Sequence, residues 1–490
     1  MSLPLELAAA RDEIREVARG LGLDFFEVVY EVVTWEEMNQ VAAYGGFPVR
    51  YPHWRFGMEF ERLAKSHAYG LSKIYELVIN NNPSIAYLQE SNELVDQKLV
   101  MAHVYGHSDF FKNNVFFAHT NRRMVDAMAQ HAAQVRRHMD RQGQDRVEAF
   151  LDLALSLEHL IDPHRVFLEA RTAPIPVTEE EPVDSPVQRI RAKEYLDSFV
   201  NPPEFLEEQR RKLAEDKLRR RRFPERPERD VLLFLAQHAA LDRWQRELLE
   251  IVREEAYYFL PQMQTKIANE GWASFWHSKI MTERILDDSE VVDYADHSAG
   301  VFAMPPGQFN PYKVGLELWR DIERRWDRGQ FGKDWEECDD YERRMAWDTK
   351  AMRGREKIFE VRRMYNDLTF IDTFLTPDFC DRSRLFVYKY NERTRRLEIS
   401  DREFLHIKEQ LLFQLTNAGH PVISVEDGNY ENRGELLLTH DHQGVDLDLQ
   451  YARDTLQNLA KIWGRPCHVV TRSGDKERLL SHDGTEFRER

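Results

Sequence analysis

Residues 99–114, LVMAHVYGHSDFFKNN, and residues 268–279, ANEGWASFWHSK, are the two stretches around which this chain is organised. His103 and His107 are four residues apart, so in a helix both imidazoles leave the same face, one turn apart. Glu270 and His277 are seven residues apart and also share a helical face. Because imidazoles and carboxylates bind divalent metals such as zinc, the two stretches predict a metal site built from two helices.

The length and charge of the chain limit what it can be. A chain of 490 residues is too long for one ordinary core and predicts two or three domains. The net charge of −17 repels nucleic acid. The basic run KLRRRR at 217–222 follows several acidic residues, which is typical of the solvated face of a charged helix. We therefore do not expect a nucleic-acid partner.

Other bulk features favour a soluble cytoplasmic protein. The longest apolar runs are far shorter than the roughly 20 residues of a membrane-spanning helix. The first residues, MSLPLELAAARDEIREV, lack the basic leader of a signal peptide. Cys338, Cys380 and Cys467 are odd in number and widely spaced, which argues against a disulfide framework.

Apolar periodicity predicts a large, mainly helical domain over residues 1–371. In residues 5–45 apolar side chains recur at intervals of three and four residues, which predicts helix. A long helix is also expected from about Glu93 through His103 and His107. A short extended piece is expected at 85–88. Residues 172–188 are rich in proline and acid, and 204–229 are highly charged, so about 172–229 is predicted to be an exposed insertion.

Residues 372–490 have a different sequence pattern. Apolar and polar residues alternate in three pairs of short segments, and the helical patterns between them end at Gly419 and Gly464. The order ββαββαββ predicts a small C-terminal α+β domain, so the fold class of the whole chain is α+β. His440 and His442 could bind a metal, but a turn after a strand is the simpler explanation of the two.

Several long motifs in one order resemble the SpoVR family, which is named for a stage V sporulation protein. They are HVYGHSDFFKNN, NEGWASFWH, DYADH at 293–297 and the aromatic opening FPVRYPHWRFGMEFERL at 47–63. The resemblance spans nearly the whole chain. It implies a link to sporulation, spore cortex formation or stress programmes, and a PrkA-type serine kinase system among the protein partners. It implies no particular reaction.

The same motifs resemble the zinc site of gluzincin peptidases, in which HVYGH corresponds to HExGH and NEGWASFW to an EGWA segment. The resemblance implies that His103, His107 and Glu270 hold a divalent metal, with zinc expected. A site of two histidines and one glutamate leaves a position open, which suits hydrolysis of an amide bond in a peptide or a cell-wall precursor. Val104 stands where the peptidases have their general base. A base must then come from elsewhere, and the candidates are Glu90, Asp109 and Glu255.

Other residues near the motifs are candidates for substrate binding. Asn113 and Asn114 could hydrogen-bond a substrate or could end the helix. Arg122 follows the first motif, and its planar fork suits a carboxylate or a phosphate.

Two further interpretations remain open. His277 could be a fourth ligand that closes the site and makes it structural. The chain would then be a noncatalytic regulatory or scaffold protein that acts through partners. A di-iron oxidase fits less well, because such sites need paired Glu-x-x-His helices and none accompanies His103.

Overall fold

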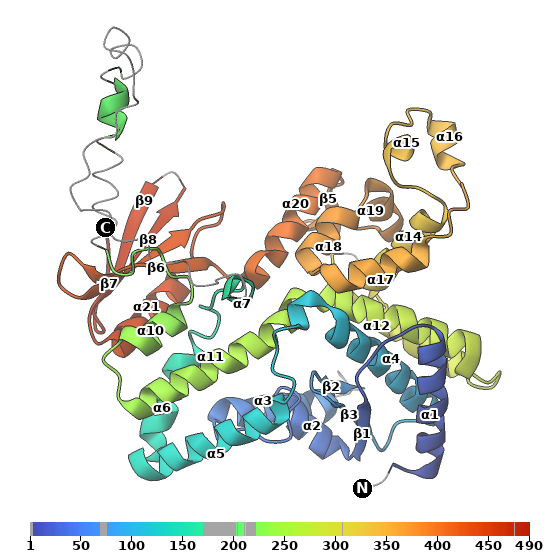
Figure 1. The fold of residues 1–490 in the computed structure, drawn as a ribbon, viewed down its shortest axis with the longest axis horizontal. Helices are drawn as coiled ribbons and strands as arrows, with labels where there is room; N and C mark the ends of the chain where they lie inside the picture. Colours follow the sequence, from blue (N-terminus) through green and yellow to red (C-terminus); the bar gives the residue numbers. More distant parts are fainter. Residues whose placement is uncertain are drawn as a thin grey trace, which may run out of the picture. The chain divides into compact units, whose positions relative to one another are not determined.

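The computed structural model describes residues 3–68, 76–169, 202, 204–209, 211, 222–305, 307–474 and 476–490. These residues form two compact units (Figure 1). Unit 1 comprises Met1–Gln144 and Tyr258–Gly419, and unit 2 comprises Asp145–Tyr257 and His420–Arg490. The mixed α+β class, with predominant helix and a small C-terminal sheet, is confirmed. The domain boundary at 371/372 stays a prediction.

The segment predicted as an exposed insertion, about 172–229, falls for the most part outside the described residues, and so does the basic run 217–222 except for Arg222. Within the described part of the chain, no helix is both long enough and apolar enough to cross a bilayer.

Unit 1 is mainly helical. Its helices are α1 (Leu5–Gly20), α2 (Trp35–Ala43), α3 (Trp54–Ala68), α4 (Leu94–Asn113), α5 (Met124–Gln142), the end of α11 (Arg243–Gln264), α12 (Lys266–Ile280), α13 (Val291–Val301), α14 (Pro311–Asp327), α15 (Lys333–Glu336), α16 (Tyr341–Met345), α17 (Gly354–Met364), α18 (Asp367–Phe374), α19 (Pro377–Ser383) and α20 (Phe404–Leu415). Its strands are β1 (Val28–Val33), β2 (Leu77–Ile79), β3 (Ser84–Gln89), β4 (Val387–Asn391) and β5 (Arg396–Asp401).

A three-stranded sheet interrupts the region that periodicity marked as helical. The prediction of continuous helix over residues 5–45 is wrong, because β1 separates α1 from α2. The β1 sequence VVYEVV is β-branched and aromatic, and its first four residues alternate buried and exposed. β1 pairs with β3 in parallel, and β2 pairs with β3 antiparallel. The extended piece predicted at 85–88 lies within β3.

The core of unit 1 is organised around α12, which packs against both α4 and α14 (Figure 1). Glycines allow these close approaches. A Cβ atom built on Gly106 of α4 would lie 2.6 Å from the Cα atom of Ala273, and one on Gly271 would lie 2.4 Å from the carbonyl carbon of Gly315. The glycines of HVYGH and EGWA are therefore needed for helix packing, because a methyl group does not fit at either contact.

Unit 2 combines α6 (Gln144–Leu155), α7 (Arg165–Glu169), α10 (Val231–His238), most of α11 and α21 (Leu449–Trp463) with one sheet. The sheet strands are β6 (Val422–Tyr430), β7 (Glu435–Asp441), β8 (Cys467–Ser473), β9 (Lys476–His482) and β10 (Phe487–Glu489), in the order β10-β9-β8-β7-β6. Only β7 and β8 pair in parallel. α21 ends at Gly464, which has the left-handed backbone expected there, and packs on β8 and β9 (Figure 1).

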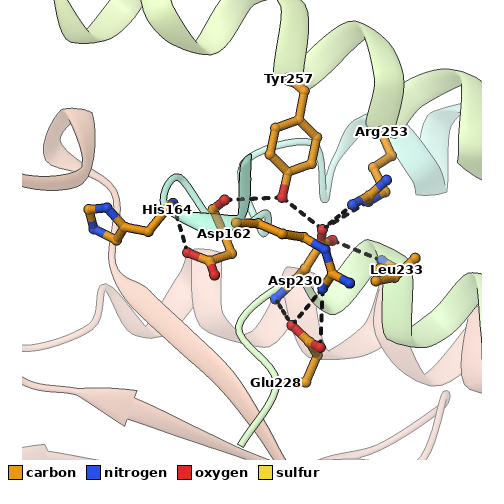
Figure 2. A network of polar contacts seen from close by, with 8 residues as sticks. Asp162, His164, Glu228, Asp230, Leu233, Arg253 and Tyr257 are labelled. Atoms are coloured by element: carbon orange, nitrogen blue, oxygen red, sulfur yellow. Dashed lines mark hydrogen bonds and ion pairs between the residues drawn. The ribbon is translucent and has the colours of Figure 1, made fainter. Parts of the chain in front are cut away.

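A fully buried carboxylate ties α10 to α11 in unit 2 (Figure 2). Asp230 caps α10 by accepting a hydrogen bond from the backbone of Leu233 at 2.9 Å. Its other oxygen accepts from Nε and Nη2 of Arg253 at 2.8 and 2.6 Å, and the Tyr257 hydroxyl lies 2.8 Å away. The paired cation offsets the cost of burying this charge.

Candidate metal centre

Four side chains in unit 1 converge on one point. His103 and His107 come from α4, Glu270 comes from α12, and Glu76 immediately precedes β2. One ligand atom from each of the four lies within 4.8 Å of the other three. Nε2 of His103 is 3.2 Å from Glu76 Oε1 and 3.5 Å from Glu270 Oε2. Nε2 of His107 is 3.9 and 3.2 Å from the same two oxygens.

These separations fit a divalent metal. Ligands of a tetrahedral zinc at its usual bond lengths lie about 3.3 to 3.4 Å apart. Nε2 of His103 and Oε2 of Glu270 are buried and have no hydrogen-bond partner among the described residues. Two carboxylates this close in a largely buried site also call for a cation. The Glu76 and Glu270 side chains are 21% and 17% exposed, so the group can be reached from solvent.

The ring orientations also suit metal binding, because each ligand histidine is held through its other nitrogen. Nδ1 of His107 lies 2.9 Å from Oδ1 of Asn269, so Nδ1 donates and Nε2 is the ring nitrogen that faces Glu76 and Glu270. Nδ1 of His103 lies 2.8 Å from Nδ1 of His277. The structure places His277, which the sequence offered as a fourth ligand, behind His103 and outside the converging group.

The electrostatics of the group reflect its buried charges. Burial lowers the pKa of His107, but the Glu270 and Glu76 carboxylates outweigh this effect and raise it to about 10. Burial raises the pKa of Glu270, but His107 and His103 hold it well below its ordinary value. Burial lowers the pKa of His277, and His103 lowers it further, which favours a neutral imidazole there.

The three predicted general bases lie in different surroundings. Asp109 is fully buried, and both of its oxygens are engaged: Oδ1 accepts from Arg362 at 2.5 Å, and Oδ2 accepts from Trp272 Nε1 at 2.8 Å. Glu90 is exposed in the turn after β3, and Glu255 is buried in the part of α11 that belongs to unit 2. None of the three belongs to the converging group.

The predicted substrate-binding residues make contacts within the protein. Nδ2 of Asn113 donates to the carbonyl oxygens of Asp24 and Asp109, each at 2.7 Å. Asn114 is buried and caps the short 3-10 helix η1 (Val115–Phe117), where its Oδ1 accepts from Phe116.

Arg122 is likewise engaged. Its guanidinium donates to the carbonyl oxygens of Phe111 and Phe117 at 2.8 and 2.9 Å, and also contacts the Asn80 side chain. These contacts assign Arg122 to the framework around the end of α4.

Val104 and Glu76 differ in what the structure shows of their surroundings. Val104 is fully buried in the main apolar core of unit 1. Glu76 was not a candidate in the sequence, because no spacing links it to either motif. The only local signal is a carboxylate directly before the apolar strand LVI. Tyr312 of α14 also lies near, with its ring centroid 6.4 Å from that of His103.

Comparison with known proteins agrees with the motifs. A family model described as "SpoVR like protein" matches residues 3–420, and one described as "SpoVR-like C-terminal domain" matches residues 421–474. A relative from Escherichia coli (strain K12), described as "Uncharacterized protein YcgB", is 32% identical over 489 residues, which cover 92% of this chain and 89% of the relative. No solved structure matches. The chain therefore belongs to the SpoVR-like family.

Proposed function

We propose that the chain is a metal-dependent hydrolase of an amide or peptide bond, in which His103, His107 and Glu270 hold a divalent metal, with zinc expected. A bound metal of this kind supplies a Lewis acid that polarises a carbonyl group and lowers the pKa of water. The single observation that carries the proposal is the convergence of these three side chains and Glu76 at ligand distances, in a largely buried site whose two carboxylates are partly exposed.

In this proposal Glu76 takes the role that Val104 cannot. Its Oε1 lies 3.2 Å from Nε2 of His103 and 3.9 Å from Nε2 of His107, so it would lie close enough to accept a proton from a water activated by the metal that these histidines would hold. The Tyr312 hydroxyl, normally neutral, would donate a hydrogen bond to the charge that develops on the carbonyl oxygen. Asp109, Glu90 and Glu255 then have no direct part in the reaction.

The substrate and setting belong to the same proposal. We infer a peptide or a cell-wall precursor as substrate, and a cytoplasmic role in sporulation, cortex formation or a stress programme together with a PrkA-type serine kinase system. This setting is what the resemblance to the SpoVR family implies.

A noncatalytic role is the second candidate, and a specific observation favours it. Four side chains lie at ligand distance, and four protein ligands would complete a tetrahedral shell and leave no open position. Glu76 would then be a ligand, and the metal would stabilise a regulatory or scaffold protein.

One variant separates the two functions. Metal content by mass spectrometry and hydrolysis of a peptide and amide panel are measured for wild type, Glu76→Gln and the exposed control Glu90→Gln. The hydrolase proposal expects Glu76→Gln to keep its metal and lose about 10²-fold or more in rate, with Glu90→Gln unchanged. Loss of metal in Glu76→Gln and no hydrolysis by wild type would favour the scaffold.

A further inference from the structure

A cavity lies near the candidate metal centre in unit 1. Its volume is about 190 Å³, and it is lined by residues of α12, α13 and α14 and the turn after α13: Ser278, Tyr294, Ser298, Phe302, Lys313, Leu316, Glu317 and Arg320. This volume equals roughly six water molecules and is below the usual size of a drug-sized site. The cavity therefore suits a small molecule or one end of a larger one.

The polar groups of this cavity favour an anion. The side chain of Lys313 forms no ion pair or hydrogen bond within the described part of the chain. Arg320 pairs with Glu317 at 3.0 Å and donates to the Ser278 hydroxyl at 3.2 Å. Two cations against one carboxylate leave a local excess of positive charge in a chain whose net charge is −17.

A hydroxyl group adds to this set. Oγ of Ser298 is buried and has no hydrogen-bond partner among the described residues. A buried hydroxyl without a partner costs free energy that a bound acceptor would recover. A lysine, an arginine and serine hydroxyls together are suited to binding a carboxylate or a phosphate.

The rest of the lining is apolar and touches the surroundings of the metal centre. The rings of Tyr294 and Phe302 lie 6.3 and 6.2 Å from the ring of His277, which holds His103. Together with Leu316, they form a wall for a short carbon chain.

We propose that this cavity, with Lys313, Arg320 and Ser298 as its binding groups, is a site for a small oxyanion, carboxylate or phosphate, that carries a short apolar group. The site does not depend on the proposed hydrolase activity. In the proposed hydrolase, the position of the cavity next to His277 makes it a subsite for an acidic substrate.

Calorimetric titration of the full chain with propionate and with inorganic phosphate tests the site and distinguishes the two anion classes. Wild type should bind at least one of them. Lys313→Met, which keeps most of the apolar stem, should bind about tenfold more weakly or worse, because it loses a charged hydrogen bond. Lys313→Arg should retain binding. Lys333→Met, on the exposed α15, removes the same charge elsewhere and should behave as wild type.

Each outcome of the titrations either supports or overturns the proposed anion site. Binding that is lost in Lys313→Met and kept in Lys333→Met supports the site, and the anion that binds more tightly names its class. If Lys313→Met does not fold, anion binding by Arg320→Gln provides a second, independent test. Equal binding by wild type and both variants, or no binding of either anion to a folded wild type, would overturn the proposal. Metal content and hydrolysis do not enter this result, so it can fail while the proposed function stands.

Discussion

The Nδ1 atom of His277 lies 2.8 Å from the Nδ1 atom of His103, whose other ring nitrogen faces Glu76 and Glu270. His277 thus orients a candidate ligand. We expect His277→Phe to weaken metal binding by about 10- to 100-fold without abolishing it, because outer hydrogen bonds of ligand histidines have effects of this size. A competition titration with a chelating dye measures the change. His103→Ala should lose the metal completely, and an equally complete loss in His277→Phe would make His277 a ligand.

Removal of the metal should lower the stability of unit 1. A ligand present at 100 times its dissociation constant stabilises the folded state by about 2.7 kcal/mol. Wild type treated with a chelator should therefore melt at a lower temperature in a thermal scan. The double variant His103→Ala, His107→Ala should show no response to the chelator. A response of the same size in that variant would place the metal elsewhere.

The contact between Gly106 and Ala273 should be intolerant of any side chain. Gly106→Ala places a methyl group 2.6 Å from a backbone atom of α12, so we expect a loss of about 1–3 kcal/mol or more in the free energy of unfolding. Gly57→Ala in α3 is the matched control, because nothing lies within 4 Å of its added Cβ atom. That change should be neutral or stabilising by up to about 1 kcal/mol. Urea unfolding of both variants compares them.

The buried carboxylate of Asp230 should be essential to unit 2. Asp230→Ala leaves Arg253 without its partner and removes the cap of α10, so the free energy of unfolding should fall by about 3–5 kcal/mol. Arg243→Ala breaks only an exposed pair with Glu247 and should cost about 0.5 kcal/mol or less. Chemical denaturation followed by circular dichroism tests both, and similar losses in the two variants would contradict the role given to Asp230.

Acidification should destabilise unit 2 through its buried histidines. Burial lowers the pKa of both His440 and His482, so each is neutral in the folded chain and gains a proton more readily when unfolded. Their contribution to stability is therefore present above the unfolded pKa of about 6.5 and is lost as the pH falls below it. Urea midpoints at several pH values should fall through this window. In His440→Gln the urea midpoint should fall less steeply with decreasing pH than in wild type. An equally steep fall in this variant would count against the explanation.

Much of the fold follows from local patterns, and its failures have a physical reason. The long helix that carries His103 was predictable because its start after Glu93 and its periodicity are both local. The strand β1 was not, because a short apolar run such as VVYEVV reads equally well as buried helix until its partner β3 is known.

For the candidate site, too, local spacing predicted some residues, while others are brought in only by the tertiary structure. His103, His107 and Glu270 share motifs whose spacing places them on helix faces, and the packing of α4 on α12 brings them together. Glu76 joins them only through tertiary structure, so no spacing could have found it. For His277, spacing gave the face of the helix but not whether the ring meets the metal position or the ring of His103.

The construction of unit 2 from two separate stretches limits how the protein can be divided. α10, from the first stretch, packs against β6 from the second, and the backbones of Glu228 and Val425 pair as an isolated bridge. A fragment cut at residue 420, where the first family match ends, would carry α10 without that strand. A fragment of 421–474 would separate β8 from β9, which pair along their whole length.

The same construction has a consequence during synthesis. α10 leaves the ribosome well before β6, against which it packs, since residues 258–419 of unit 1 come between. Phe234 of α10, whose ring lies 5.7 Å from that of Trp463 in α21, lacks this contact during that interval. Nascent chains of this protein should therefore be chaperone clients until the last strands emerge.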